Sequence, residues 1–167
     1  MRILLLALIL IGPLPAADWG PLQYLVGNWT GEGDGSPGKG SGGFSFSEDL
    51  QGKILVRRNF ADYPAQGGKP AFRHDDLMIV YRDADGKTLR AMYFDNEGHT
   101  IPYLVDAGAN AAVFTSEGAR DTTRFRFTYT RAPNGGPDSV KIKFEIAPPG
   151  KDLAVYIEAV AHRAAGK

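Results

Sequence analysis

The sequence predicts an all-β protein, an antiparallel barrel of about ten short strands closed by a short N-terminal helix. Turn-forming clusters recur along the chain, among them Asp85-Gly86, Glu97-Gly98 and Glu117-Gly118. Their spacing of about ten to fifteen residues is typical of a sandwich or a barrel. Between these clusters, apolar and charged residues alternate, as they do in half-buried strands. A two-sheet sandwich without a cavity is the alternative.

The first 17 residues have the pattern of a secretory signal peptide. Arg2 is followed by an unbroken apolar run over 3–11 and then by a short segment that ends at Ala17. The run is shorter than the roughly 20 residues that a membrane span needs. We therefore expect cleavage after Ala16 or Ala17, one barrel domain over 18–167, and a periplasmic or secreted protein without a membrane span. A retained N-terminal anchor is the alternative.

Composition excludes several classes of function. The chain has no cysteine, so disulfides, thiol catalysis and thiolate metal sites are not available. Its 19 basic residues balance 19 acidic residues, and no segment is strongly basic. Nucleic acid is therefore not an expected partner. The sequence does not indicate an oligomeric state.

The barrel domain is expected to begin with the short helix. Asp18 can cap its N-terminus, Pro21 suits its first turn, and Gly27 ends it. Leu22 and Leu25 share one face, and a helix this short must pack on the barrel to be stable.

Ten later segments have the length and composition of strands. The stretch 31–43 is rich in glycine and is predicted to be a flexible loop. The predicted strands span 28–32, 43–47, 54–62, 76–82, 88–94, 101–105, 111–115, 122–131, 139–146 and 153–163.

The late strands alternate most clearly. Phe125, Phe127 and Tyr129 lie on one face of their strand, and Phe144 belongs to a similar apolar row in the next one. In the last strand, the predicted apolar row is Leu153, Val155, Ile157, Ala159 and Ala161. Its predicted reverse side is Tyr156, Glu158, Val160 and His162.

A cavity follows from the number of strands. Eight strands enclose just enough room for their own side chains or for one small ligand, so about ten enclose more. We expect a cavity of roughly a few hundred Å³ and, as partner, a small apolar or amphipathic molecule. The candidate ligand-binding residues are Tyr93, Asp95, Tyr103, Phe125, Phe127, Tyr129 and Phe144, with Arg58 as a polar anchor.

The choice of Arg58 rests on alternation. Arg57 and Arg58 are adjacent, so they point to opposite faces of their strand. The face of Arg58 carries the apolar side chains of Ile54, Val56 and Phe60. Arg58 is therefore predicted to be interior, where it needs either a structural carboxylate such as Asp95 or the carboxylate or phosphate of a ligand.

The segment Gly27-Asn28-Trp29, at the start of the first strand, resembles the opening motif of lipocalins and their relatives. The resemblance implies a lipocalin-like barrel in which Trp29 closes the base and a late arginine stacks on it. Arg163, at the end of the last strand, is the matching arginine. Such a stack contributes about 0.5–2 kcal/mol. The role implied for both residues is structural.

The longer motif from Gly27 to Gly33 is similar to nitrobindin, a haem-binding barrel, and equally to exported bacterial lipocalin-like domains of uncharacterised function. Residues 92–98 match a second motif of those exported domains, which we favour. The nitrobindin alternative would imply a haem held by a late histidine. His162 is that histidine, and alternation places it on the polar side of its strand, so we expect no cofactor.

His74 and His99 support a further hypothesis. They are predicted at strand ends or turns, near Asp95 and other carboxylates. Two histidines with carboxylates suit Zn²⁺ or acid–base catalysis at the barrel mouth. No His-Glu-x-x-His spacing is present, so surface turn residues are the simpler interpretation. No catalytic residue is assigned, and whether the protein is an enzyme stays open.

Overall fold

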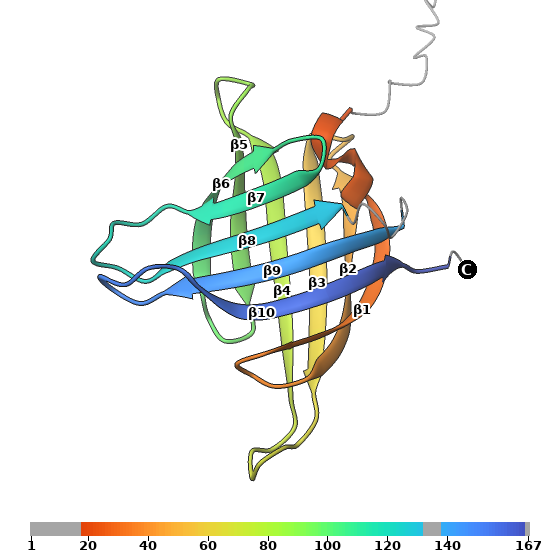
Figure 1. The fold of residues 1–167 in the computed structure, drawn as a ribbon. Coiled ribbons are helices and arrows are strands. Elements are labelled where there is room, and N and C mark those ends of the chain that lie inside the picture. The colour runs from red at the N-terminus through yellow and green to blue at the C-terminus, as the bar shows by residue number, and fades with distance from the viewer. Residues whose placement is uncertain (1–17, 132–137, 166–167) are drawn as a thin grey trace, which may run out of the picture.

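A computed structural model describes residues 18–131 and 138–165, which form a closed antiparallel barrel of ten strands (Figure 1). Around the barrel the strand order is β1-β10-β9-β8-β7-β6-β5-β4-β3-β2. The strands are β1 (Gly27–Gly35), β2 (Gly40–Asp49), β3 (Ile54–Tyr63), β4 (Phe72–Arg82), β5 (Leu89–Asp95), β6 (Thr100–Ala107), β7 (Ala111–Ser116), β8 (Arg124–Arg131), β9 (Ser139–Ala147) and β10 (Ala154–Arg163). The predicted all-β barrel is confirmed. The signal peptide predicted over 1–17 lies outside the described residues.

The predicted helix is present as a 3-10 helix, η1 (Gly20–Leu25), which lies across one end of the barrel (Figure 1). Asp18 accepts a hydrogen bond from the backbone N–H of Gly20 at 2.7 Å, and Pro21 lies in the first turn. Leu22 and Leu25 are completely buried in the core. Their burial anchors a helix that is too short to be stable alone.

Trp29 and Arg163 make the contact that the sequence predicts. They are paired across β1 and β10, and the Arg163 guanidinium lies 4.4 Å from the centre of the Trp29 ring. The same guanidinium donates hydrogen bonds to the carbonyls of Val26 at 2.8 Å and Tyr24 at 3.1 Å. Arg163 therefore holds the end of η1 against the barrel as well as covering Trp29.

The end of the barrel beneath η1 is filled by side chains. Its buried core contains Trp29, Phe46, Leu55, Met78, Val80, Tyr103, Phe114, Tyr129 and Val140. Tyr129 packs at 5.4–6.1 Å from the rings of Phe44, Phe46 and Phe114. This end is therefore a solid core, and any room for a ligand must lie towards the other end.

The glycine-rich segment is not the predicted loop, because β1 continues to Gly35 and β2 starts at Gly40. A Cβ at Gly31 would come within 2.2 Å of the Val160 carbonyl oxygen of β10, and one at Gly42 within 2.2 Å of the Phe60 carbonyl of β3. Only glycine permits these backbones to approach so closely. The glycines therefore form paired strands and leave the inner face of that part of the barrel wall without side chains.

A β-bulge in β10 changes the predicted faces near its start. The pairing with β9 shifts between Val155 and Ile157, so Tyr156 lines the barrel interior and Val155 is 51 % exposed. The prediction was the reverse for both residues. A bulge inserts one extra residue, which alternation alone does not detect.

We predict that Arg163→Met lowers the free energy of unfolding by about 2–4 kcal/mol, because one cation–π contact, two hydrogen bonds to backbone carbonyls and an ion pair with the exposed Asp138 are lost together. Urea unfolding followed by Trp fluorescence measures the change. Arg120→Met is the matched control, since Arg120 pairs with Asp152 on the exposed surface, and it is expected to cost less than about 1 kcal/mol. Equal effects of the two variants would contradict the structural role of Arg163.

Candidate functional site

The half of the barrel away from η1 contains a cavity of about 770 Å³ that opens to solvent. This volume is large enough for a small-molecule ligand. Tyr93, Asp95, Phe125, Phe127 and Phe144 line it, as predicted from the sequence. Tyr103 and Tyr129 do not, because they are packed in the solid core.

One wall of the cavity is aromatic. It is formed by Phe125 and Phe127 on β8, Phe144 on β9 and Tyr156 on β10. The rings of Phe125 and Phe144 are parallel within 2° with centres 6.1 Å apart, and Tyr156 meets Phe144 edge to face at 6.1 Å. This wall offers a ligand a broad apolar surface.

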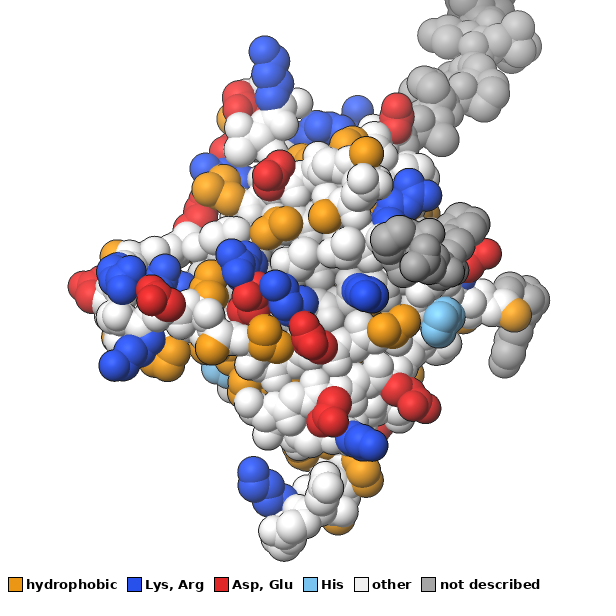
Figure 2. All heavy atoms as spheres, in the orientation of Figure 1, with side chains coloured by type: hydrophobic (Ala, Val, Ile, Leu, Met, Phe, Trp, Pro, Cys, Tyr) orange, Lys and Arg blue, Asp and Glu red, His pale blue; other side chains and the backbone are white. Residues whose placement is uncertain are grey.

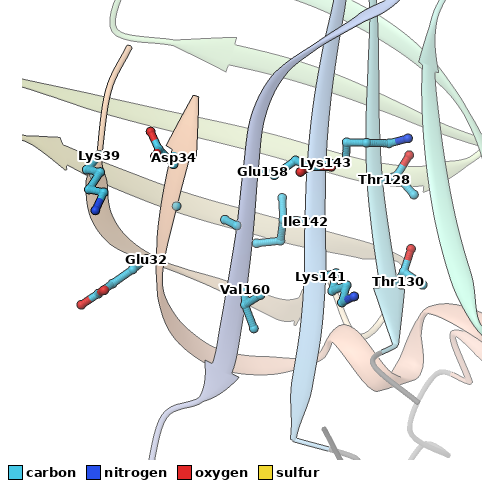
Figure 3. Close-up of a pocket in the computed structure, with 13 residues that line it drawn as sticks. Glu32, Asp34, Lys39, Thr128, Thr130, Lys141, Ile142, Lys143, Glu158 and Val160 are labelled. Carbon is cyan, nitrogen blue, oxygen red and sulfur yellow. The ribbon is translucent and has the colours of Figure 1, made fainter. Parts of the chain in front are cut away.

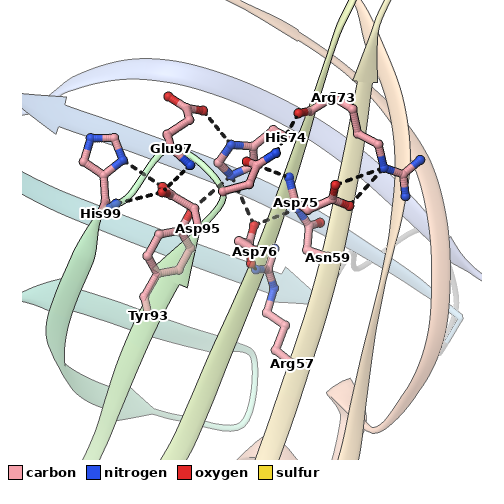
Figure 4. Close-up of polar contacts among 11 residues, drawn as sticks. Arg57, Asn59, Arg73, His74, Asp75, Asp76, Tyr93, Asp95, Glu97 and His99 are labelled. Carbon is pink, nitrogen blue, oxygen red and sulfur yellow. Dashed lines mark hydrogen bonds and ion pairs between the residues drawn. The ribbon is translucent and has the colours of Figure 1, made fainter.

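The facing wall is polar. Its side chains come from β3, β4 and β5 (Figure 4), which lie halfway around the strand order from β8, β9 and β10. The polar residues are Arg57, Asn59, His74, Asp76, Tyr93 and Asp95. A bound molecule would therefore meet an apolar surface on one side and hydrogen-bonding groups on the other.

Arg57 and Asp76 form an ion pair at the floor of the cavity, with only 2 % and 4 % of their side chains exposed. Asn59 donates a second hydrogen bond to Asp76 at 2.8 Å. The Arg57 guanidinium lies 5.1 Å from the ring centre of Phe127 and 5.8 Å from that of Phe44. Burial would lower the pKa of Arg57, but the Asp76 carboxylate together with the neighbouring Tyr129 and Tyr93 hydroxyl groups outweighs burial and raises that pKa. Arg57 therefore remains charged.

The prediction that Arg58 is the interior arginine is wrong. Arg58 is exposed, and Arg57 faces inward together with Leu55 and Asn59. The apolar residues that suggested the opposite lie on the outer face, where Arg73 covers Phe60 with a cation–π contact at 4.4 Å. An apolar side chain on a strand is therefore not proof of an inward face.

His74 connects the polar wall to the rim. Strand β4 begins at Phe72, earlier than predicted, so His74 lies within a strand and not at a turn. Its Nε2 is 3.0 Å from the Tyr93 hydroxyl and 3.4 Å from Asp76, and its Nδ1 is 2.8 Å from Glu97. The hydrogen bond with Asp76, with a smaller contribution from Glu97, outweighs burial and raises the pKa of His74 to about 9.

Asp95 and His99 form a second pair at the mouth. Asp95 Oδ1 accepts hydrogen bonds from the backbone N–H groups of Glu97 at 3.0 Å and His99 at 2.9 Å. Its Oδ2 lies 2.8 Å from His99 Nδ1. Burial would raise the pKa of Asp95, but the bonds from His99 hold it below its usual value. Tyr93 donates to Asp95 at 3.3 Å, which joins this pair to His74.

The histidines do not form a metal site in this geometry. Within residues 18–131 and 138–165, no group of three or more potential His or carboxylate ligands is placed to hold a metal ion. The late histidine that the nitrobindin alternative would need, His162, is not among the residues that line the cavity. His162 is exposed on β10, as predicted, and both ring nitrogens of His74 already contact protein groups.

A second hollow lies on the outside of the barrel over β1, β10, β9 and β8 (Figure 3). Its acidic and basic side chains are Glu32, Asp34, Glu158, Lys39, Lys141 and Lys143. Figure 2 shows charges of both signs interspersed over the outer face of β8, β9 and β10. This mixture is typical of a solvated sheet face, so the interior cavity is the stronger candidate site.

Sequence reasoning missed Arg57, Asn59, Tyr156 and the glycine wall, which is the inner face of β1 and β2 at Gly31, Gly33, Gly35, Gly40 and Gly42. Asp76 was expected among the carboxylates near His74, and the two residues meet because they are two apart on one face of β4, which extends back to Phe72. The bulge beside Tyr156 left no comparable signal.

The raised pKa of His74 predicts a pH-dependent stability. The folded-state pKa lies above the ordinary value of 6.5. The stabilisation is therefore fully present below about pH 6.5 and is lost as the pH rises to about 9, to a limit of about 3 kcal/mol. Urea unfolding between pH 6 and pH 9.5 measures this loss, and His74→Gln should remove it. NMR titration of the His74 imidazole near pH 6.5 would contradict the assignment.

Comparisons with known proteins extend only to the fold. No protein-family model matches the chain, and no curated protein matches its sequence. The crystal structure of Rv2717c from M. tuberculosis matches with a TM-score of 0.61 and 16 % identity, over 87 % of this chain and 98 % of that one. The phycobiliprotein lyase CPES from Guillardia theta matches with a TM-score of 0.55 and 9 % identity, over 87 % and 92 % of the two chains.

These likenesses show that the two proteins share the barrel fold of this chain. The narrower resemblances to exported bacterial domains and to nitrobindin stay predictions. No helix in the described ranges, 18–131 and 138–165, has the length and apolar character needed to cross a membrane.

Proposed function

We propose that the barrel binds a small amphipathic molecule in its cavity. The observation that carries the proposal is the opposition of the two walls, aromatic on β8–β10 and polar on β3–β5. A molecule with an apolar body would cover Phe125, Phe127 and Phe144 and would direct its polar group towards Arg57 or His74. Burial of apolar surface contributes roughly 25 cal/mol per Å², so a ligand that fills much of the cavity gains a useful affinity.

Binding accounts for this site better than catalysis does. The hypothesis of an enzyme built on His74, His99 and Asp95 is supported in one respect, since Tyr93 links these residues by hydrogen bonds. However, His74 has contacts at both ring nitrogens, and Asp95 accepts four hydrogen bonds. Such a network fixes the shape and charge of a binding wall.

The binding proposal predicts that a neutral fluorescent probe, N-phenyl-1-naphthylamine, gains fluorescence when it enters the cavity. Ala61→Phe should weaken its binding by about ten-fold or more, because Ala61 lines the cavity on β3 and the new ring takes up space that the probe would fill. Fluorescence titration measures the change. Thr128→Phe is the matched control, since Thr128 lines the outer hollow, and it should leave the affinity unchanged. No binding by the folded wild-type protein, or equal loss in both variants, would reject the proposal.

We also propose that the protein acts after export, as a periplasmic or secreted protein. The support is the basic residue and apolar run that precede Ala17. The intact mass of protein isolated from its own host should correspond to a chain that starts at Ala17 or Asp18. A full-length chain recovered from the membrane fraction would instead identify a retained anchor.

A further inference from the structure

The floor of the cavity presents hydrogen-bond donors that the protein does not fully use. A guanidinium carries five N–H groups. In the part of the chain that the structure describes, Arg57 Nη1 donates to Asp76, and the guanidinium also lies beside the Tyr129 hydroxyl on the core side, while Arg57 Nε makes no hydrogen bond of good geometry. Buried donors without a partner are costly. Arg57 lines the cavity with 2 % of its side chain exposed, so an acceptor on a ligand is well placed to meet it.

The charge of Arg57 is nevertheless already balanced. Asp76 pairs with it directly, and Asp95 and Glu97 add two further carboxylates to the same side of the cavity. His74 supplies a second positive charge on this side, and it contacts the carboxylates of Asp76 and Glu97. A ligand carboxylate or phosphate would add another negative charge to three carboxylates, in a place where burial of an unpaired charge is expensive.

The acceptors deep in the cavity have little free capacity. Asp76 takes Arg57 on one oxygen and both Asn59 and His74 on the other. Asp95 accepts hydrogen bonds from two backbone N–H groups, from Tyr93 and from His99. A donor group on the ligand therefore finds few open lone pairs on these two carboxylates, whereas an acceptor finds Arg57.

We propose that the ligand is uncharged and presents a carbonyl-type acceptor to Arg57 while its apolar body lies on Phe125, Phe127 and Phe144. This inference rests on the proposed binding function and names the class of molecule bound. It also means that the cavity discriminates against carboxylates and phosphates of the same size.

The test is a competition series with one shared body. 2-Acetylnaphthalene carries a carbonyl, 2-ethylnaphthalene carries no polar group, and 2-naphthoate carries a carboxylate. The displacement of N-phenyl-1-naphthylamine from the wild-type protein by each compound is measured. The ketone should compete best, and the carboxylate at least about ten-fold worse than the ketone. The ketone carbonyl should also shift to a lower infrared stretching frequency when bound, as a hydrogen-bonded carbonyl does.

The Asp76→Asn variant is the second part of the test, because it removes the carboxylate that neutralises the positive charge of Arg57. It should raise the affinity for 2-naphthoate about ten-fold relative to the ketone. Asp75→Asn is the matched control, since Asp75 is the next residue and lies on the outer face with Arg73. Circular dichroism establishes that each variant is folded, and the wild-type series decides alone if Asp76→Asn does not fold.

The outcomes separate the two proposals. Equal or tighter binding of 2-naphthoate than of the ketone in the wild-type protein would overturn the inference and leave the binding function standing. Equal affinity for the ketone and 2-ethylnaphthalene, with an unshifted carbonyl, would do the same. Failure of the probe and of all three competitors to bind would reject the binding function itself.

Discussion

The buried ion pair between Arg57 and Asp76 is the constraint on which the organisation of the barrel interior depends. It joins neighbouring strands β3 and β4, and the Arg57 guanidinium reaches Phe127 on β8 across the barrel. On the side of η1 lies a packed core, and on the opposite side lies a cavity of about 770 Å³. Removing either partner would leave an uncompensated buried charge, which is among the most destabilising changes a protein interior can undergo. The pair is thus both a structural tie and the floor of the candidate site.

The solid half of the barrel makes the hollow half possible. Trp29, Leu22 and Leu25 fill the end beneath η1, and Arg163 fastens that helix through two carbonyls. Apolar burial is concentrated at this end, so the other end can keep space and polar groups that contribute less to stability. The polar wall then has to satisfy its own hydrogen bonds, which it does through the series of contacts from Asp76 to His99.

Local sequence patterns were sufficient for much of this fold. Turn spacing predicted the barrel, alternation placed Phe125, Phe127 and Phe144 inside, and the Gly27-x-Trp29 motif led to Arg163. Patterns could not decide between Arg57 and Arg58, because both faces of β3 carry apolar residues. They also could not assemble the polar wall, whose members come from three strands and meet only through the sheet register. Local alternation assigns faces but not partners.

The glycine wall restricts how this barrel can change. Side chains at Gly31, Gly35 and Gly42 would collide with backbone atoms of neighbouring strands, so these positions cannot acquire new chemistry without altering the strand pairing. Evolution or engineering of a different ligand preference must therefore work through β3–β5 and β8–β10, where side chains already face the cavity. The glycine wall on β1 and β2 therefore keeps a fixed shape, and the selectivity of the cavity depends on the polar wall and the aromatic wall.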